Sequence, residues 1–188
     1  TDANGIASLA RGLNILVTGG SGFIGTRLIG DFLAAGHQAA LFDIAASAAY
    51  PALCLRGDVR DGKALTAAGA GRAVIIHLAG KTLASWPWTA ATKKAFHDSR
   101  VIPGLALVEA ILQATQRPGI FIQQSGINHY GLSGDLADES TPPGSDFLSQ
   151  LTVEWENTTK PLEELGLRRI VTRTAPVLDK KDGLMPLM

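Results

Sequence analysis

Four glycines within seven residues, directly after a short apolar segment, constrain this chain more than any other feature. Residues 13–18 are apolar and β-branched, which is typical of a strand buried on both faces. Two spacings then overlap: Gly20, Gly22 and Gly25 fit G-x-G-x-x-G, whereas Gly19, Gly22 and Gly25 fit G-x-x-G-x-x-G. Such glycines permit a tight turn and let the backbone approach a ligand closely.

The segment after the turn, residues 23–35, carries apolar residues at helical spacing, and Gly36 suits the helix C-terminus. A helix that begins at the turn offers free N–H groups and a positive dipole end to a pyrophosphate, and Gly25 would let that helix pack closely on the sheet. The pattern therefore predicts a dinucleotide site. Its first cofactor-binding residues are Gly19, Gly22, Phe23, Ile24 and Gly25.

A P-loop is the main rival interpretation of the turn. Gly20 and Gly25-Thr26 have the required spacing, but no Lys precedes Thr26. Without the phosphate-reaching lysine, we exclude a Walker-type nucleotide hydrolase.

Strand-like and helix-like segments alternate along the rest of the chain. We expect strands at 38–42, 52–56, 73–78, 120–124 and 169–174, and helices at 62–68, 89–115 and 147–165, with a kink or break near Pro103 and a late break at Pro161. The Gly/Pro/Ser/Asp-rich stretch 126–145 is a long loop, and such loops are more often functional than not. The alternation predicts the α/β class, a Rossmann-type doubly wound parallel sheet with ligands at the carboxyl ends of its strands.

Asp43 ends the second expected strand, about 20 residues after the glycines. An acidic side chain there can accept hydrogen bonds from both ribose hydroxyls of NAD and would repel a 2′-phosphate. The cofactor is therefore NAD or NADP, with NAD favoured by Asp43.

Composition excludes several classes of function. Among the 188 residues, Lys+Arg and Asp+Glu both number 17, and a net charge of zero argues against a nucleic-acid binder. No apolar run reaches the ~18 residues that span a bilayer, and no His/Cys cluster has metal-ligand spacing. The lone cysteine, Cys54, reads as a small buried hydrophobe, and a chain without an internal disulfide suits the cytoplasm.

Residues 16–25 closely resemble the TGGxGFIG signature of the extended short-chain dehydrogenase/reductase family. Residues 57–61, 76–80 and 173–177 resemble further landmarks of that family in the same order. The resemblance implies that Asp58 and Val59 lie beside the adenine ring and that Leu78, Ala79 and Gly80 line the cofactor.

A narrower resemblance is to the atypical NAD-dependent epimerase/dehydratase subgroup, which contains nucleoside-diphosphate-sugar epimerase-like proteins. It is carried by residues 77–80, 86–88, 99–100, 129–131, 146–148 and 155–156. It implies a small-molecule substrate, a nucleotide sugar, and transient hydride transfer; it leaves self-association into a homo-oligomer open.

One departure bears on the chemistry. The wider family uses Tyr-x-x-x-Lys for proton transfer, but neither Tyr50 nor Tyr130 has Lys four residues later, and residues 147–156 contain no Tyr. Lys160 has Glu156 four residues before it. The alternative function is therefore a catalytically silent NAD(P)-binding sensor or scaffold.

Ser125 follows the strand 120–124, where the family places its catalytic Ser or Thr, and is our candidate catalytic residue; a turn-initiating Ser is the alternative. Tyr130 resembles a structural Tyr of the family. Its neighbour His129 could titrate near neutral pH, although an exposed loop histidine is the commoner case.

The remaining polar and aromatic candidates carry weaker signals. His77 reads as a core or strand-end histidine. Glu154 and Glu156, two apart on a helix, point in different directions and form no close pair. Trp86 and Trp88 either stack on a sugar or base or anchor their loop.

The chain divides into three parts on these grounds. Residues 1–12 are a lead-in of unknown role, 13–178 form the NAD(P)-binding domain, and 179–188 begin a truncated substrate-binding segment. In the family, that segment continues for about one hundred residues, a normal size for such a lobe.

Overall fold

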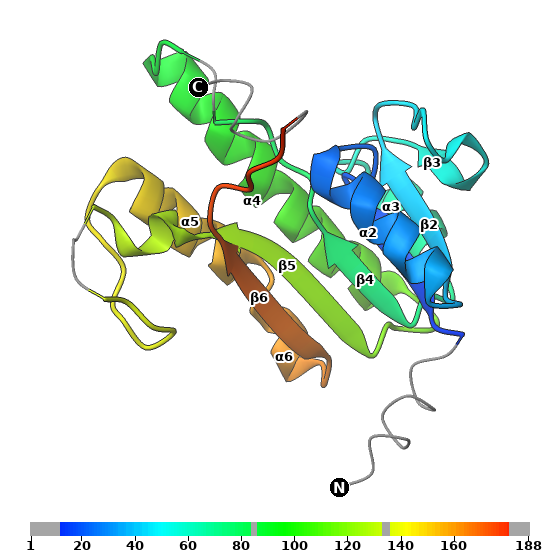
Figure 1. The fold of residues 1–188 in the computed structure, drawn as a ribbon. Helices are drawn as coiled ribbons and strands as arrows, with labels where there is room; N and C mark the ends of the chain where they lie inside the picture. Colours follow the sequence, from blue (N-terminus) through cyan, green and yellow to red (C-terminus); the bar gives the residue numbers. More distant parts are fainter. Residues whose placement is uncertain (1–11, 84–85, 133–135, 181–188) are drawn as a thin grey trace, which may run out of the picture.

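Six parallel strands form one sheet in the computed structural model, which describes residues 12–83, 86–132 and 136–180 (Figure 1). The strand order is β3-β2-β1-β4-β5-β6. The chain adds β2 and β3 on one side of β1 and then crosses over to add β4, β5 and β6 on the other side. The topological switch point therefore lies between the neighbouring strands β1 and β4. The strands are β1 (Asn14–Thr18), β2 (Gln38–Asp43), β3 (Cys54–Arg56), β4 (Val74–His77), β5 (Ile120–Gly126) and β6 (Arg168–Thr174). This is the Rossmann-type doubly wound sheet that the alternating pattern predicts.

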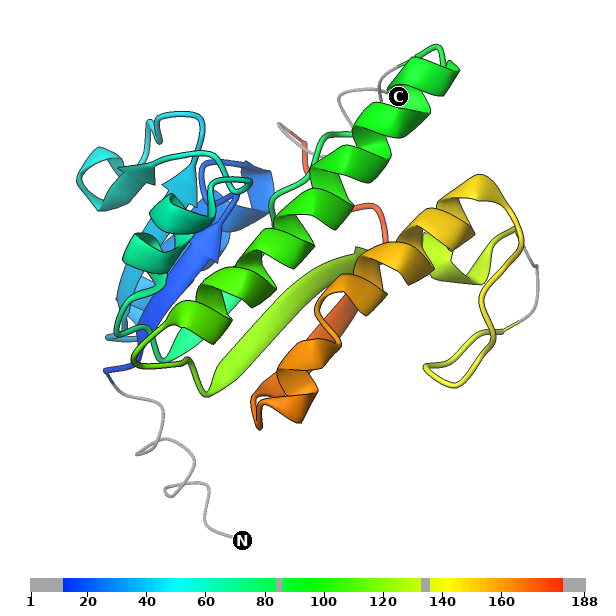
Figure 2. The same cartoon turned by 180° about the vertical axis from the view of Figure 1, so that it is seen from behind.

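Helices cover both faces of the sheet. They are α2 (Phe23–Ala34), α3 (Gly62–Gly69), α4 (Ala90–Gln113), α5 (Phe147–Thr158) and α6 (Pro161–Glu164), with short 3-10 turns η1 (Pro51–Leu53) and η2 (Ile127–Tyr130). Helix α2 lies in front of the sheet in Figure 1, whereas α4, α5 and α6 lie behind it, as Figure 2 shows from the other side.

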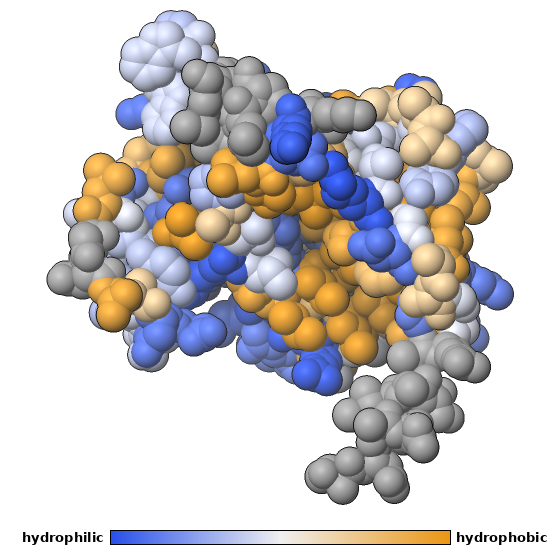
Figure 3. Space-filling model, viewed as in Figure 1, coloured by the Kyte–Doolittle hydropathy of each residue, from blue (hydrophilic) through white to orange (hydrophobic). Residues whose placement is uncertain are grey.

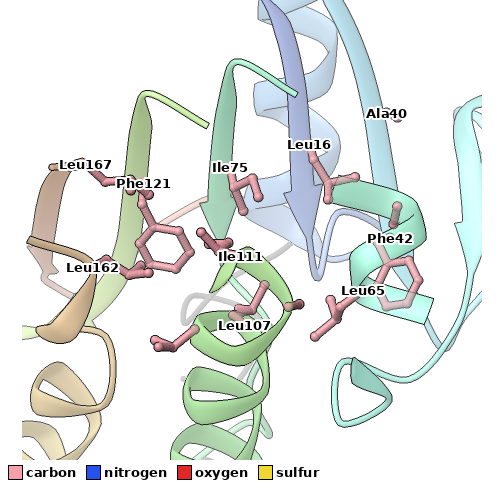
Figure 4. Close-up of a cluster of buried hydrophobic side chains, with 13 residues drawn as sticks. Leu16, Ala40, Phe42, Leu65, Ile75, Leu107, Ile111, Phe121, Leu162 and Leu167 are labelled. Carbon is pink, nitrogen blue, oxygen red and sulfur yellow. The ribbon is translucent and has the colours of Figure 1, made fainter. Parts of the chain in front are cut away.

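The larger hydrophobic core fills the space between the sheet and the helices behind it (Figure 4). Leu16 and Phe121 point from the strands toward Leu107 and Ile111 of α4, and all four side chains are nearly free of solvent contact. Each such burial contributes roughly 1.5–3 kcal/mol. This packing fixes the strand ends, and therefore the site built on them.

No helix of the part of the chain that the structure describes lies in front of β5 and β6 (Figure 1). Along β5, buried and partly exposed residues alternate, and Ile120 and Ile122 are among the partly exposed ones. Figure 3 accordingly shows apolar atoms at the surface in front of β4 and β5.

Three local predictions are corrected by the structure. The long helix α4 is not broken at Pro103, because residues on both sides of the proline, including Val101 and Leu107, are buried against the core. The strand expected over 52–56 starts only at Cys54, after a 3-10 turn. The late break expected at Pro161 is confirmed, since α5 ends at Thr158 and Pro161 begins α6.

Cys54 is the third correction. It is half-buried rather than buried, and its thiol donates to the carbonyl of Ala45 over 3.6 Å. Of the predicted divisions of the chain, residues 1–11 and 181–188 lie outside the described residues.

Candidate functional site

A cleft of about 460 Å³ opens at the carboxyl ends of β4, β5 and β6. The strand ends contribute Leu78, Gly80, Ser125 and Thr174 to its lining, and α2 contributes Phe23 and Ile24. Parallel strands bring their carboxyl ends to one edge, so a ligand here meets several elements at once.

The glycine turn is built so closely that three of its positions leave no room for a Cβ. A Cβ on Gly20 would lie 2.4 Å from Cβ of Leu41. Gly19 has φ +72°, and a Cβ on it would lie 2.7 Å from the backbone N of Ala79. A Cβ on Gly25 would lie 2.5 Å from Cα of Gly20. The tightest neighbour of Gly25 is thus the turn itself rather than a strand, which corrects the expected reason for that glycine.

The N-terminus of α2 is open toward a ligand. Gly22 caps it without a side-chain hydrogen bond, whereas Asp61, Thr89 and Asp146 cap α3, α4 and α5 with theirs. A Cβ on Gly22 would meet only the carbonyl O of Gly19, at 3.4 Å. Uncapped amides, the dipole end and this free space fit the pyrophosphate of a dinucleotide.

Asp43 is tied to the same turn. Its Oδ2 accepts a hydrogen bond from the backbone N of Ser21, and its Oδ1 accepts one from Ala45, both at 3.0 Å. A carboxylate offers about four acceptor positions, so two remain for ribose hydroxyls. Arg56 is the residue opposite Asp43 on β3, and its guanidinium donates to the carbonyl of Ile44.

The other predicted cofactor residues lie in two groups. Leu78 and Gly80 line the cleft, and Ala79 lies between them against Gly19. Asp58 and Val59 lie outside the cleft lining. The guanidinium of Arg60 holds the Asp58 carboxylate and its hydrogen bonds lower the pKa of that carboxyl, while Val59 packs against the larger core.

Ser125 belongs to a hydrogen-bonded group that joins β5, α5 and β6. Its hydroxyl donates to Oε1 of Glu156 over 2.6 Å, and Arg173 donates to both oxygens of Glu156 at 2.9 Å. Burial raises the pKa of the Glu156 carboxyl, but the hydrogen bonds from Arg173 and Ser125 outweigh it, and the pKa falls below its ordinary value. Glu156 is therefore a carboxylate at neutral pH, and Ser125 Oγ keeps its lone pairs for a ligand in the cleft.

His129 and Tyr130 lie next to the hydrogen-bonded group of Ser125, Glu156 and Arg173. His129 is buried, not exposed as expected, and its Nδ1 lies 3.7 Å from Oε2 of Glu156. Burial and the charge of Arg173 lower the pKa of His129. Tyr130 accepts a hydrogen bond from Arg173 at 3.0 Å and stacks under its guanidinium, which suits the expected structural role.

Helix α5 presents no proton-transferring pair to the cleft. Its cleft-lining residues at i, i+4 spacing are Leu148 with Thr152 and Leu151 with Trp155. The place of a Tyr-x-x-x-Lys pair is thus taken by side chains without a phenol or an amine. The polar group that reaches Ser125 from α5 is Glu156 instead.

His77 is a core residue, as expected. Its ring is fully buried, and Nδ1 shares a 2.7 Å hydrogen bond with Oγ1 of Thr18, its register partner on β1. Burial, together with the nearby charge of Arg100, lowers the pKa of His77 to about 4. The neutral ring joins β1 to β4 beneath the site.

The remaining sequence candidates do not converge on the cleft. Glu154 bonds to His97 on α4 rather than approaching Glu156. Trp88 packs edge-on against Phe96 and Phe147, which fits a loop anchor, whereas Trp86 is 84% exposed.

Three residues of this region were not predicted from the sequence: Glu156 and Arg173 as the hydrogen-bonded group beside Ser125, and Arg100 as part of the cleft lining. The helical spacing of α5 could have indicated the first of them. Glu156 follows Thr152 by four residues on the buried face, and a carboxylate on a buried face needs a partner.

The described ranges show neither a metal-ligand cluster nor a membrane-spanning helix. No three His, Cys, Asp or Glu side chains in them approach one another as metal ligands would. In the same part of the chain, no helix has both the length and the hydropathy to cross a membrane.

Comparison with known proteins shows where this architecture recurs. "Epimerase family protein Mb2239" of Mycobacterium bovis is 31% identical over 93% of this chain and 57% of its own length. The crystal structure of human epimerase family protein SDR39U1 with NADPH superposes with a TM-score of 0.80 at 28% identity, over 94% of this chain and 58% of that one. A nucleoside-diphosphate sugar epimerase from Corynebacterium glutamicum has a TM-score of 0.77 at 24% identity, over 97% of this chain and 39% of that one, which shows a shared fold.

The chain thus spans a little over half the length of the curated relative and of the human structure. The model of the NAD dependent epimerase/dehydratase family matches residues 15–174, from β1 to the last residue of β6. This match covers the glycine turn, Asp43, Ser125 and Glu156, and the chain belongs to the NAD dependent epimerase/dehydratase family.

Proposed function

We propose that this chain binds NAD(P) across the glycine turn and forms the cofactor-binding part of an oxidoreductase or epimerase that acts on a nucleotide sugar by transient hydride transfer. The observation that best supports this proposal is the N-terminus of α2, which has no side-chain cap at Gly22. It lies beside the tight turn that Gly19 and Gly25 form. Family membership and the NADPH bound by the human relative support the same conclusion.

The cofactor-binding residues follow from that placement. The amides after Gly22 would hold the pyrophosphate, with Phe23 and Ile24 beside it and Leu78, Ala79 and Gly80 along the nicotinamide half. Asp43 would hold the adenosine ribose and favour NAD, while Asp58 and Val59 would border the adenine. The NADPH in the human relative favours the other cofactor, so a direct comparison of affinities must decide.

Ser125 is the proposed catalytic residue. A substrate hydroxyl in the cleft can donate to Ser125 Oγ while the Ser125 proton moves to Oε1 of Glu156, 2.6 Å away. A nicotinamide bound beside this group would supply hydride transfer to and from the neighbouring carbon. Glu156, held by Arg173, is the positioning residue that keeps the serine proton directed away from the substrate.

The proposal is tested in two stages. NADH is first titrated into the chain, with energy transfer from tryptophan as the signal. NAD and UDP-glucose are then incubated with the protein, and the sugar is followed by NMR for epimerised or oxidised products. Ser125→Ala should keep NADH affinity within about threefold and lose about 100-fold or more in rate, the usual effect of removing an acid–base group.

The second candidate is a catalytically silent NAD(P)-binding sensor or scaffold, favoured by Leu148 and Thr152 on the cleft face of α5. Cofactor binding without turnover of any nucleotide sugar would establish it, whereas Ser125-dependent turnover would exclude it. The cytoplasmic location is a prediction that rests on the lone cysteine, and self-association into a homo-oligomer stays a prediction as well.

A further inference from the structure

Arg100 is a buried cation in the cleft, and no Asp or Glu side chain of the described ranges pairs with it. The residue is 9% exposed, and it belongs to the cleft lining. Its side-chain hydrogen bonds to described residues run from Nη1, to the carbonyl of Phe96 at 3.3 Å and to Oγ of Ser99 at 3.2 Å. Both acceptors are neutral and both contacts are long, so Nε and Nη2 keep their N–H groups for another acceptor.

The surroundings of Arg100 also lack negative charge. Trp155 lies under the guanidinium, with Cζ 5.2 Å from the ring centroid, and His77 nearby is held neutral. Among the described residues that line the cleft there is no Asp or Glu, while Lys81 adds a second cation at the rim. Burial lowers the pKa of Arg100 to about 10, still far above neutral pH. The side chain therefore keeps its charge in a poorly solvated place.

A buried charge without a counter-charge is costly, and proteins keep one where a ligand supplies the opposite sign. Guanidinium groups bind carboxylates and phosphates through paired N–H donors. A Cβ on Gly80 would lie 3.6 Å from Cζ of Arg100, so the bare backbone at the end of β4 leaves room beside the guanidinium.

We infer that Arg100 is the binding residue for a ligand oxyanion, a phosphate or carboxylate group, at the β4 end of the cleft. The inference rests on the function proposed above and deepens it: it assigns an anionic ligand to the same cleft, and it gives a role to a buried side chain that is not among the cofactor-binding and catalytic residues proposed above. The oxyanion belongs either to the dinucleotide or to a second molecule bound beside it.

The test uses inorganic pyrophosphate as the probe, titrated into the chain by calorimetry at low salt. Arg100→Gln should weaken binding by about tenfold or more, because it removes a charge-assisted pair, and Arg100→Lys should recover part of the loss. Lys81→Gln is the matched control, since it removes an equal charge from the rim of the same cleft; it should change affinity less than about threefold. Equal losses in the two variants, or none in Arg100→Gln, would overturn the inference.

Thermal unfolding separates a binding role from a structural one. Without ligand, Arg100→Met should be as stable as the parent chain or more stable, because it removes an unpaired buried charge, and pyrophosphate should stabilise the parent more than the variant. A clear destabilisation of Arg100→Met that pyrophosphate does not change would assign Arg100 to the core and overturn the inference.

The source of the oxyanion follows from repeating the titration with saturating NADH. Loss of the Arg100-dependent binding assigns the anion to the dinucleotide, and its persistence assigns it to a second ligand; both outcomes support the site. If the chain binds no NADH at all, the proposed function fails, while the Arg100-dependent binding of pyrophosphate can still be measured by itself.

Discussion

Ser125 and Glu156 are 31 residues apart in the sequence, and the hydroxyl of the first donates to the carboxylate of the second over 2.6 Å. Ser125 is also the register partner of Arg173 on β6, and Arg173 clamps both oxygens of Glu156. One carboxylate therefore connects β5, β6 and α5 beside Ser125, which lines the cleft. The same bonds that position Ser125 also hold this edge of the sheet together.

Substitutions in this group should cost stability in a set order. Glu156→Gln leaves the charge of Arg173 without its counter-charge and should lower the free energy of unfolding by about 3 kcal/mol. Ser125→Ala removes one hydrogen bond and should cost about 1–2 kcal/mol. The double variant should cost less than the sum, because both changes remove the same contact. Urea denaturation followed by circular dichroism measures all three.

Glu154→Gln is the control for this series. Glu154 lies two residues earlier on α5, its side chain is 56% exposed, and among the described residues its side chain bonds only to His97. Its loss should change stability by less than about 0.5 kcal/mol. If Glu154→Gln lowers the free energy of unfolding as much as Glu156→Gln does, the larger contribution assigned to the buried Glu156 carboxylate is wrong.

The glycine turn separates binding from folding. Gly22→Val should abolish NADH binding, because its side chain enters the space in front of α2, yet leave the fold intact, since a Cβ there meets only one atom at 3.4 Å. Gly25→Ala should instead destabilise the chain, because its Cβ would lie 2.5 Å from Gly20, and overpacking typically costs about 1–3 kcal/mol. NADH titration and urea unfolding of both variants check this; retained NADH affinity in Gly22→Val would remove the turn from the site.

The fold was predictable from the sequence because its signals are local. Short β-branched runs, helical spacing and the glycine turn each report on neighbouring residues, and the alternation of strands and helices implies a parallel sheet with right-handed crossovers. The errors fell where local signals conflict with packing. The helix α4 continues through Pro103 because the residues on both sides are held against the core, including Val101 and Leu107.

The candidate site was predictable only in part. The glycines, Asp43 and Ser125 stand at strand ends, and their places follow from chain order alone. The partnership of Ser125 with Glu156 and Arg173 depends on how α5 crosses behind β5 and β6, which no local pattern encodes. Arg100 likewise looks like an ordinary helix residue until α4 is packed against the end of β4.

Asp43 should control which dinucleotide is preferred. If its carboxylate holds the ribose hydroxyls, the chain binds NADH more tightly than NADPH, and Asp43→Asn shifts the ratio of the two dissociation constants toward NADPH by about tenfold, the effect of losing a charge-assisted hydrogen bond. Asp58→Asn is the control, since Arg60 already occupies that carboxylate, and it should leave the ratio unchanged. Tighter binding of NADPH by the parent chain would show that the preference assigned to Asp43 is wrong.

His77 should make stability depend on pH in a defined window. Its pKa is about 4 in the folded chain against 6.5 for a free histidine, so between these values the unfolded state binds more protons. Stability from this group is full above about pH 6.5 and falls by about 3 kcal/mol as the pH drops to 4. His77→Gln should flatten that part of the curve, measured by urea unfolding at closely spaced pH values. His97→Gln should act with the opposite sign, because the hydrogen bond that the His97 ring donates to the Glu154 carboxylate raises the pKa of His97, and the stability that this group contributes is lost as the pH rises. A parent curve that stays flat between pH 6.5 and 4 would show that the buried His77 ring is not held neutral.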